Sequence, residues 1–188
     1  MTDKEIFDLL ENDNTRERGF SVLVNQLKER VYWQIRRMVL SHEDANDLAQ
    51  EVFIKVFKNI DNFKHDSSLS TWVYRVALNH SLNFLQSQKR RKALHFSSLE
   101  NSMLDNLKSD KFFESNEIEL KFQKALLSLP NKQRMVFNLR YYDEMPFKEM
   151  AQVLETSESS LKSSYHFASK KVQEQLLEEE NVKLGLID

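Results

Sequence analysis

The sequence is notable first for the residues that it lacks. It contains no cysteine, which excludes a disulfide framework, a thiolate metal site and a cysteine nucleophile. Only two glycines and two prolines occur in 188 residues, so tight β-hairpin turns and Gly-rich phosphate loops are disfavoured and helices are favoured. No long apolar run resembles a signal peptide or a membrane span. We therefore expect an all-α protein that stays in the cytosol and does not insert into a membrane.

The residues that are present support two small helical domains. A hydrophobic content of 40% is enough to build cores. Apolar residues recur every three or four positions over about 15–40, 43–59 and 70–91, which predicts helices there, and Thr2 with Glu5 predicts a capping box for a short first helix. From 93 to 115 this periodicity weakens. We expect domains at 1–92 and 116–188, joined by a flexible acidic linker at 93–115.

The charge is distributed unevenly, although the net charge is only −2. Basic residues gather at 89–92 and near 170, whereas acidic residues gather at 43–51, along 100–119 and at 178–180. A partner responds to the local potential and not to the sum of charges. The segregation therefore predicts at least two kinds of partner surface.

The helix predicted at 43–59 has an acidic face. A rotation of about 100° per residue places Asp47, Gln50, Glu51 and Ile54 together, opposite the predicted buried side. An isoleucine surrounded by acids and an amide suggests a docking site for another protein. An ordinary solvated face with one stray apolar residue explains the same pattern, because single apolar residues are common on surfaces.

The helix predicted at 70–91 carries an amide-rich face, formed by Arg75, Asn79, Asn83 and Gln86. Asparagine is a poor residue for a helix interior, so two of them four residues apart need an explanation. Hydrogen bonding to base edges is one explanation, with phosphate contacts from Lys89, Arg90, Arg91 and Lys92. A wet face that ends in a basic helix C-terminus is the other. We expect the buried side to comprise Leu69, Trp72, Val73, Val76, Ala77 and Phe84. Trp72 and Tyr74 are further candidates for stacking on unpaired bases.

The segment from Phe147 to Lys171 has the pattern of a helix-turn-helix. Pro130 and Pro146 predict helix starts, Ser157 predicts a cap, and Leu161, Tyr165 and Ala168 predict the buried side of the second helix. In such a motif the second helix enters the DNA major groove. Its predicted exposed side chains would contact bases or phosphates, and they are Ser159, Ser160, Lys162, Ser163, His166, Lys170 and Lys171.

Three blocks of sequence, in their order and spacing, resemble the bacterial RNA polymerase sigma factors of the extracytoplasmic-function (ECF) group. The blocks are DANDLAQEVFIKVF, SSLSTWVYRVALNHSLNFL and LPNKQRMVFNLRYYDEMPFKEMAQVLETSESSLKSSYHFASKK. The sequence departs from the family where Glu155 replaces a usual glycine, and where Ser164 and Phe167 replace frequent arginines. Loss of that glycine costs about 1 kcal/mol of stability if the position needs a positive φ.

The resemblance implies a role for each surface. Asp47, Gln50 and Glu51, with Ile54, would grip the clamp helices of the largest subunit of core RNA polymerase, and the polymerase flap would be a further contact. The loop from Lys64 to Ser70, with Asp66, Ser67 and Ser68, would capture a base extruded from the downstream (−10) promoter element, which Asn79 and its neighbours would help to read. The helix-turn-helix would bind the upstream (−35) element as duplex. The acidic linker would thread polymerase channels, and an anti-sigma protein is a further implied partner.

Other function classes remain as alternatives. The five histidines lie in different segments without a ligand spacing, so we expect no metal site, no cofactor, no small-molecule substrate and no catalysis.

A free-standing helix-turn-helix regulator would bind duplex DNA without polymerase, and would leave the acidic face unused. A helical adaptor would need neither the basic run nor the amides.

Overall fold

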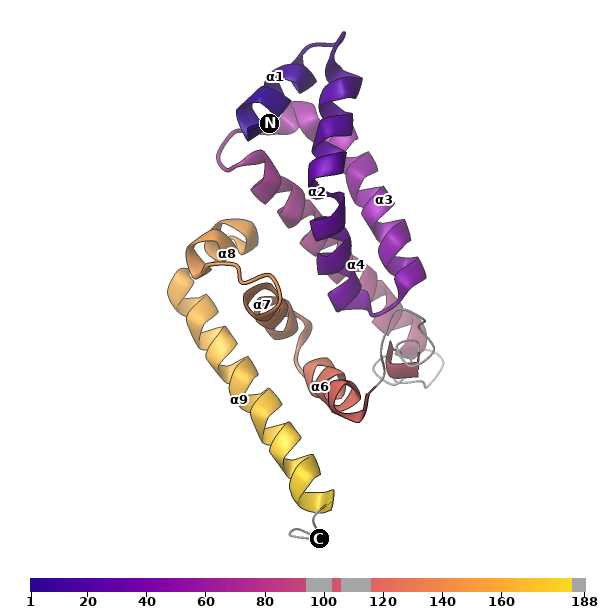
Figure 1. Cartoon of the computed structure of the whole chain (residues 1–188), viewed down its shortest axis with the longest axis vertical. Helices are drawn as coiled ribbons and strands as arrows, with labels where there is room; N and C mark the ends of the chain where they lie inside the picture. Colours follow the sequence, from indigo (N-terminus) through magenta and orange to yellow (C-terminus); the bar gives the residue numbers. More distant parts are fainter. Residues whose placement is uncertain (94–102, 106–115, 184–188) are drawn as a thin grey trace. The chain divides into compact units, whose positions relative to one another are not determined.

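The computed structural model describes residues 1–93, 103–105 and 116–183, and every regular element in these ranges is a helix (Figure 1). The all-α prediction is confirmed. The described residues form two compact units that divide within one long helix, between Ser87 and Gln88. None of the described helices is long and apolar enough to cross a membrane. Most of the linker predicted at 93–115 lies outside the described residues.

The N-terminal unit is a helical bundle. Its elements are α1 (Asp3–Glu11), α2 (Arg16–Val39), α3 (His42–Asn59), the 3-10 helix η1 (Ile60–Asn62) and the part of α4 (Leu69–Ala93) up to Ser87. Helix α1 packs on α2, and α2 packs on α3 (Figure 1). All four long helices contribute fully buried apolar side chains to the core, among them Ile6, Val31, Ile35, Val52, Val73 and Ala77. Burial of these side chains fixes the rotation of each helix about its axis.

Short polar side chains set where these helices begin. The predicted capping box is present: the Thr2 hydroxyl accepts from the backbone N–H of Glu5 at 3.3 Å, and the Glu5 carboxylate accepts from the backbone N–H of Thr2 at 2.7 Å. The Thr2 backbone N–H, and after it the Thr2 side chain, hydrogen-bond to the Glu5 carboxylate and hold its pKa below its usual value. Ser41 caps α3 by accepting from the backbone N–H of Asp44 at 3.2 Å. Each cap satisfies backbone donors that the first turn of a helix leaves unpaired.

The crossing of α1 over α2 depends on Gly19. A Cβ atom at this position would lie 2.8 Å from the Cβ of Leu9 and 3.1 Å from the backbone nitrogen of Leu10. Any side chain would therefore push the two helices apart. Thr15 adds a polar tie, because its hydroxyl donates to the Leu9 carbonyl at 2.8 Å. The α1–α2 crossing is thus fixed by a close approach of backbone to backbone.

The buried side of α4 differs in part from the prediction. Leu69, Val73 and Ala77 are buried as expected, but Trp72, Val76 and Phe84 are only half-buried. Tyr74, Leu78 and Leu85 are buried instead. Tyr74 is only 3% exposed, and the Arg30 guanidinium lies 4.6 Å from the centroid of its ring. The expectation that Tyr74 is available to stack on a base is therefore wrong, because the ring packs toward α2.

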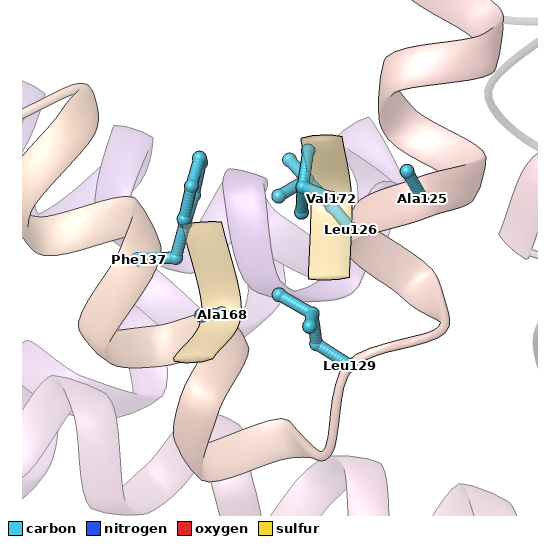
Figure 2. Close-up of a cluster of buried hydrophobic side chains, with 6 residues drawn as sticks. All are labelled: Ala125, Leu126, Leu129, Phe137, Ala168 and Val172. Carbon is cyan, nitrogen blue, oxygen red and sulfur yellow. The ribbon is translucent and has the colours of Figure 1, made fainter. Parts of the chain in front are cut away.

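The C-terminal unit contains α6 (Glu117–Leu127), α7 (Asn131–Tyr141), α8 (Phe147–Leu154) and α9 (Glu158–Lys183). Pro130 and Pro146 occupy the N-cap positions of α7 and α8, so both proline predictions are confirmed. Figure 2 shows the core of this unit, in which Ala168 and Val172 of α9 lie among side chains of α6 and α7. The other members of this cluster are Ala125, Leu126, Leu129 and Phe137.

Helices α8 and α9 form the predicted helix-turn-helix. The turn begins at Glu155, whose φ of 51° and ψ of 44° are left-handed. Its backbone N–H donates to the Ala151 carbonyl, which closes the end of α8. Ser157 then caps α9 by accepting from the backbone N–H of Ser160 at 3.3 Å. The position that glycine usually occupies in the family therefore keeps the conformation that favours glycine.

We predict that Glu155→Gly stabilises the C-terminal unit by about 1 kcal/mol, because glycine adopts a positive φ without a steric penalty. Urea unfolding, followed by circular dichroism, measures the change. The matched control is Gln173→Gly, an exposed position in the middle of α9, where glycine should destabilise by about 1 kcal/mol. Equal destabilisation by both substitutions would contradict the assignment of strain to Glu155.

Candidate docking and nucleic-acid surfaces

The first surface is the α3 face, formed by Asp47, Gln50, Glu51 and Ile54. All four side chains are exposed, and Ile54 is 54% exposed despite being fully apolar. The opposite side of the helix is buried through Ala45, Leu48, Val52, Phe53 and Val56. The structure thus brings the four predicted residues together on one outward side. The pattern of an apolar centre with an acidic rim is typical of a protein-docking site.

A hydrogen-bonded relay, which the sequence did not reveal, joins the α3 face to α4. The Lys55 Nζ lies 2.6 Å from His80 Nδ1, and His80 Nε2 lies 2.6 Å from Glu51 Oε2. A lysine ammonium can only donate, so Nδ1 of the imidazole accepts and Nε2 carries the hydrogen. The relay therefore runs from Lys55 through the His80 ring to the carboxylate of Glu51. It fixes one member of the α3 face from the neighbouring helix.

The second surface is the 64–70 loop, which we define as the connection from η1 to α4 together with the first two residues of α4. Lys64, Asp66 and Ser68 are exposed and Ser67 is half-buried, so the four predicted side chains lie at or near the surface. The loop ends in a cap, because the Ser68 hydroxyl accepts from the backbone N–H of Thr71 at 3.0 Å and contacts the Thr71 hydroxyl at 2.7 Å. The 64–70 loop is thus a defined turn that presents polar groups.

The third surface runs along α4 directly after this loop. Asn79, Asn83 and Gln86 are exposed at helical spacing, as the sequence predicted, while Arg75 is only half-exposed. Lys89, Arg90 and Arg91 continue on the exposed surface of the helix. The side chain of Lys92 lies outside the described residues. Amide groups followed by cations can supply hydrogen bonds to bases and contacts to phosphates.

The fourth surface is the α9 polar face, on the second helix of the helix-turn-helix. Its members are all exposed: Ser159, Ser160, Lys162, Ser163, His166 and Lys170. Two of the cations have nearby acids, since Lys162 lies 3.6 Å from Glu158 and Lys170 lies 3.7 Å from Glu174. Such exposed pairs on one helix are weak and can be replaced by phosphate contacts.

Two further exposed residues, the predicted Lys171 and its neighbour Phe167, have features that the sequence did not predict. The Lys171 ammonium donates to the Ser128 carbonyl at 2.9 Å, so in this structure it ties α9 to the end of α6. Phe167, which was not among the predicted site residues, is 61% exposed. The only indication in the sequence was the residue type, because the resembled family often has an arginine at this position. An exposed aromatic ring on such a helix can contact the methyl group of thymine.

Comparison with known proteins places these surfaces in a family context. The family model for Sigma-70 region 2 matches residues 23–91, and the one for Sigma-70 region 4 matches residues 119–172. The chain is 28% identical to the ECF RNA polymerase sigma factor SigW of Bacillus subtilis over 166 residues, which are 84% of this chain and 89% of that protein. It is 27% identical to the ECF RNA polymerase sigma-E factor of Escherichia coli K12, over 87% of this chain and 88% of that protein.

Solved structures agree in fold. The chain is similar to CnrH in complex with the cytosolic domain of CnrY, with a TM-score of 0.64 and 20% identity over 93% of this chain and 96% of that one. It is also similar to the sigma factor RpoE in complex with the anti-sigma factor NepR from Bartonella quintana, with a TM-score of 0.59 and 18% identity over 84% and 96% of the two chains.

We predict that Nδ1 of His80 accepts from Lys55 and that Nε2 carries the hydrogen that points to Glu51. Long-range nitrogen–proton NMR correlation of the ring measures the protonated nitrogen directly. Lys55→Met should remove the donor at Nδ1 and change the pattern of ring shifts, whereas Lys58→Met, an exposed lysine one turn further along α3, should leave it unchanged. A ring protonated on Nδ1 at neutral pH would contradict the relay.

Proposed function

Because the chain belongs to the sigma-70 family, in its extracytoplasmic-function group, and so serves promoter-specific initiation by RNA polymerase, we propose that its four surfaces divide this work. The α3 face binds core polymerase. The 64–70 loop and α4 bind the downstream promoter element, and the α9 polar face binds the upstream element. The observation that carries the proposal is that most side chains of the three predicted sets lie exposed within the segments that the two family models match.

The proposed polymerase contact is supported by the chemistry of the α3 face. Asp47 and Glu51 supply negative charge, Gln50 supplies an amide, and Ile54 supplies an apolar centre. The His80 relay restricts the Glu51 carboxylate before any partner arrives, which lowers the entropy lost on binding. The partner should present basic residues around an apolar site, and we propose the clamp helices of the largest polymerase subunit.

Recognition of the downstream element is supported by the continuity of the 64–70 loop with α4. Unstacking a base costs a few kcal/mol, and its capture by polar groups and rings offsets that cost. Asn79 and Asn83 lie exposed on the helix that follows the loop, and can accept and donate hydrogen bonds to bases. Lys89, Arg90 and Arg91 would contact phosphates further along the same strand.

Recognition of the upstream element is supported by the helix-turn-helix. Its second helix exposes serines and a histidine that can bond to base edges, and Lys170 can contact the backbone. Lys171 would contribute through the position of α9 as well as through its charge, because it already binds the Ser128 carbonyl. With Phe167 in place of an arginine, the preferred base should differ from a guanine.

The proposed domains are 1–92, with region 2, and 116–188, with region 4, joined by residues 93–115. As a polymerase subunit the protein would perform no reaction of its own and would act in the cytosol. Two structural neighbours are bound to other proteins, one of them named an anti-sigma factor. We propose that an anti-sigma protein also regulates this chain, and that the polymerase flap contacts the C-terminal domain.

Charge reversal on the α3 face tests the docking proposal. Asp47→Lys or Glu51→Lys should abolish assembly with core RNA polymerase, because each places a cation where basic residues must bind, while helix content stays unchanged. Co-purification and analytical ultracentrifugation measure the assembly. Glu29→Lys, the same charge change at an exposed position of α2, is the matched control. Holoenzyme that forms normally with both α3 variants would refute this role of the face.

Removal of one amide tests the downstream contact. Asn79→Ala should weaken open-complex formation by about 1–3 kcal/mol if a base contact is lost. The measurement is transcription by reconstituted holoenzyme from duplex and from pre-melted promoters. Asn25→Ala, an exposed asparagine of α2, is the control. Transcription at the wild-type level from both templates would exclude Asn79 from recognition.

A further inference from the structure

Helix α1 lies before the segment that the region 2 family model matches, yet it contacts the 64–70 loop directly. The match begins at residue 23, whereas α1 spans Asp3–Glu11. The Asp3 carboxylate oxygen Oδ2 accepts from the backbone N–H of Ser70 at 3.2 Å and from its hydroxyl at 3.4 Å. Asp3 thus holds the end of the loop at the point where α4 begins.

A cluster of rings holds the other half of the loop. His65 has a positive φ of 57°, which few residues adopt without support. Its ring meets Phe7 of α1 edge to face, with centroids 4.2 Å apart and an angle of 81°, and lies 4.8 Å from the ring of Phe63. Phe63 in turn packs 5.5 Å from Trp72. The contact with Phe7 therefore supports the strained residue of the loop.

Helix α1 can support the loop because its own position is fixed. Gly19 allows the close crossing with α2, and the Thr2 capping box closes the N-terminus next to Asp3. A further tie holds the segment before the loop: the Arg16 guanidinium donates to the Asp61 carboxylate at 2.8 Å, and this hydrogen bond lowers the pKa of Asp61. Contacts from Asp3, Phe7 and Arg16 therefore hold the loop and the segment before it.

We propose that α1 is a positioning element that sets the 64–70 loop for capture of an extruded promoter base, with Asp3 and Phe7 as its positioning residues. The inference rests on the proposed function of the loop. A loop that is ordered before DNA arrives loses less conformational entropy on binding. Loss of either contact should then weaken base capture, while the α3 face and the α9 polar face stay intact.

The test compares Asp3→Ala, Phe7→Ala and Gly19→Ala with the control Asp8→Ala, an exposed aspartate of the same helix. Gly19 faces Leu9 and Leu10, so Gly19→Ala acts on the loop only through α1. Each protein is assembled with core polymerase on a promoter selected from genomic DNA. Affinity is then measured on pre-melted templates in which the downstream bases are replaced one at a time by abasic sites.

Wild-type and Asp8→Ala holoenzymes should lose affinity on the order of tenfold at the captured base. In Asp3→Ala, Phe7→Ala and Gly19→Ala the same abasic site should cost about threefold or less, with normal assembly. Thermal unfolding identifies any variant that folds poorly, and Asp3→Ala, which removes the hydrogen bonds to Ser70 but no buried apolar side chain, keeps the test valid if Phe7→Ala unfolds.

The possible results distinguish the positioning role of α1 from base capture by the loop. An undiminished abasic penalty in all three variants would overturn the positioning role and leave the proposed function standing, because a merely destabilised protein loses affinity equally on every template. Absence of any penalty in the wild-type holoenzyme would refute base capture itself, and with it the role of α1.

Discussion

Burial of one apolar side of each helix decides which side chains this protein presents to its partners. In α3, Leu48, Val52 and Val56 turn inward, and the same rotation leaves Ile54 and its acidic neighbours outside. In α9, Leu161, Ala168 and Val172 are buried, which leaves a row of serines and lysines exposed. A helix that rotated by one residue would bury charge and expose apolar surface at once. The cores therefore determine the binding surfaces as well as the stability.

Electrostatics separates the two classes of partner on a chain with almost no net charge. The acids of the α3 face suit a basic protein surface, and the cations of α4 and α9 suit phosphates. The acidic α3 face and the polar face of α4 are connected through His80. This residue contacts Glu51 on α3 and follows Asn79 directly in α4. The proposed docking on polymerase and the proposed contact with downstream DNA would thus depend on neighbouring side chains of one bundle.

Much of the fold could be predicted because helical period, caps and prolines are local signals. Thr2, Ser157, Pro130 and Pro146 mark helix ends that the structure confirms, and exposure followed from spacing for Asp47, Glu51 and Asn79. What the sequence did not predict involves contacts between helices. Arg30 lies over the ring of the buried Tyr74, Lys171 donates to a carbonyl at the end of α6, and Asp3 accepts from Ser70, 67 residues away. Sequence spacing within one helix carries no information on such partners.

The central claim is that this chain acts as a subunit of RNA polymerase. Mapping of transcription start sites tests this claim most directly. Purified protein is mixed with core polymerase, and the 5′ ends of transcripts made from genomic DNA are determined with and without it. The account predicts stoichiometric capture of the core enzyme and a new set of start sites that share two spaced sequence elements. Binding to DNA without polymerase, or start sites unchanged by the protein, would contradict it.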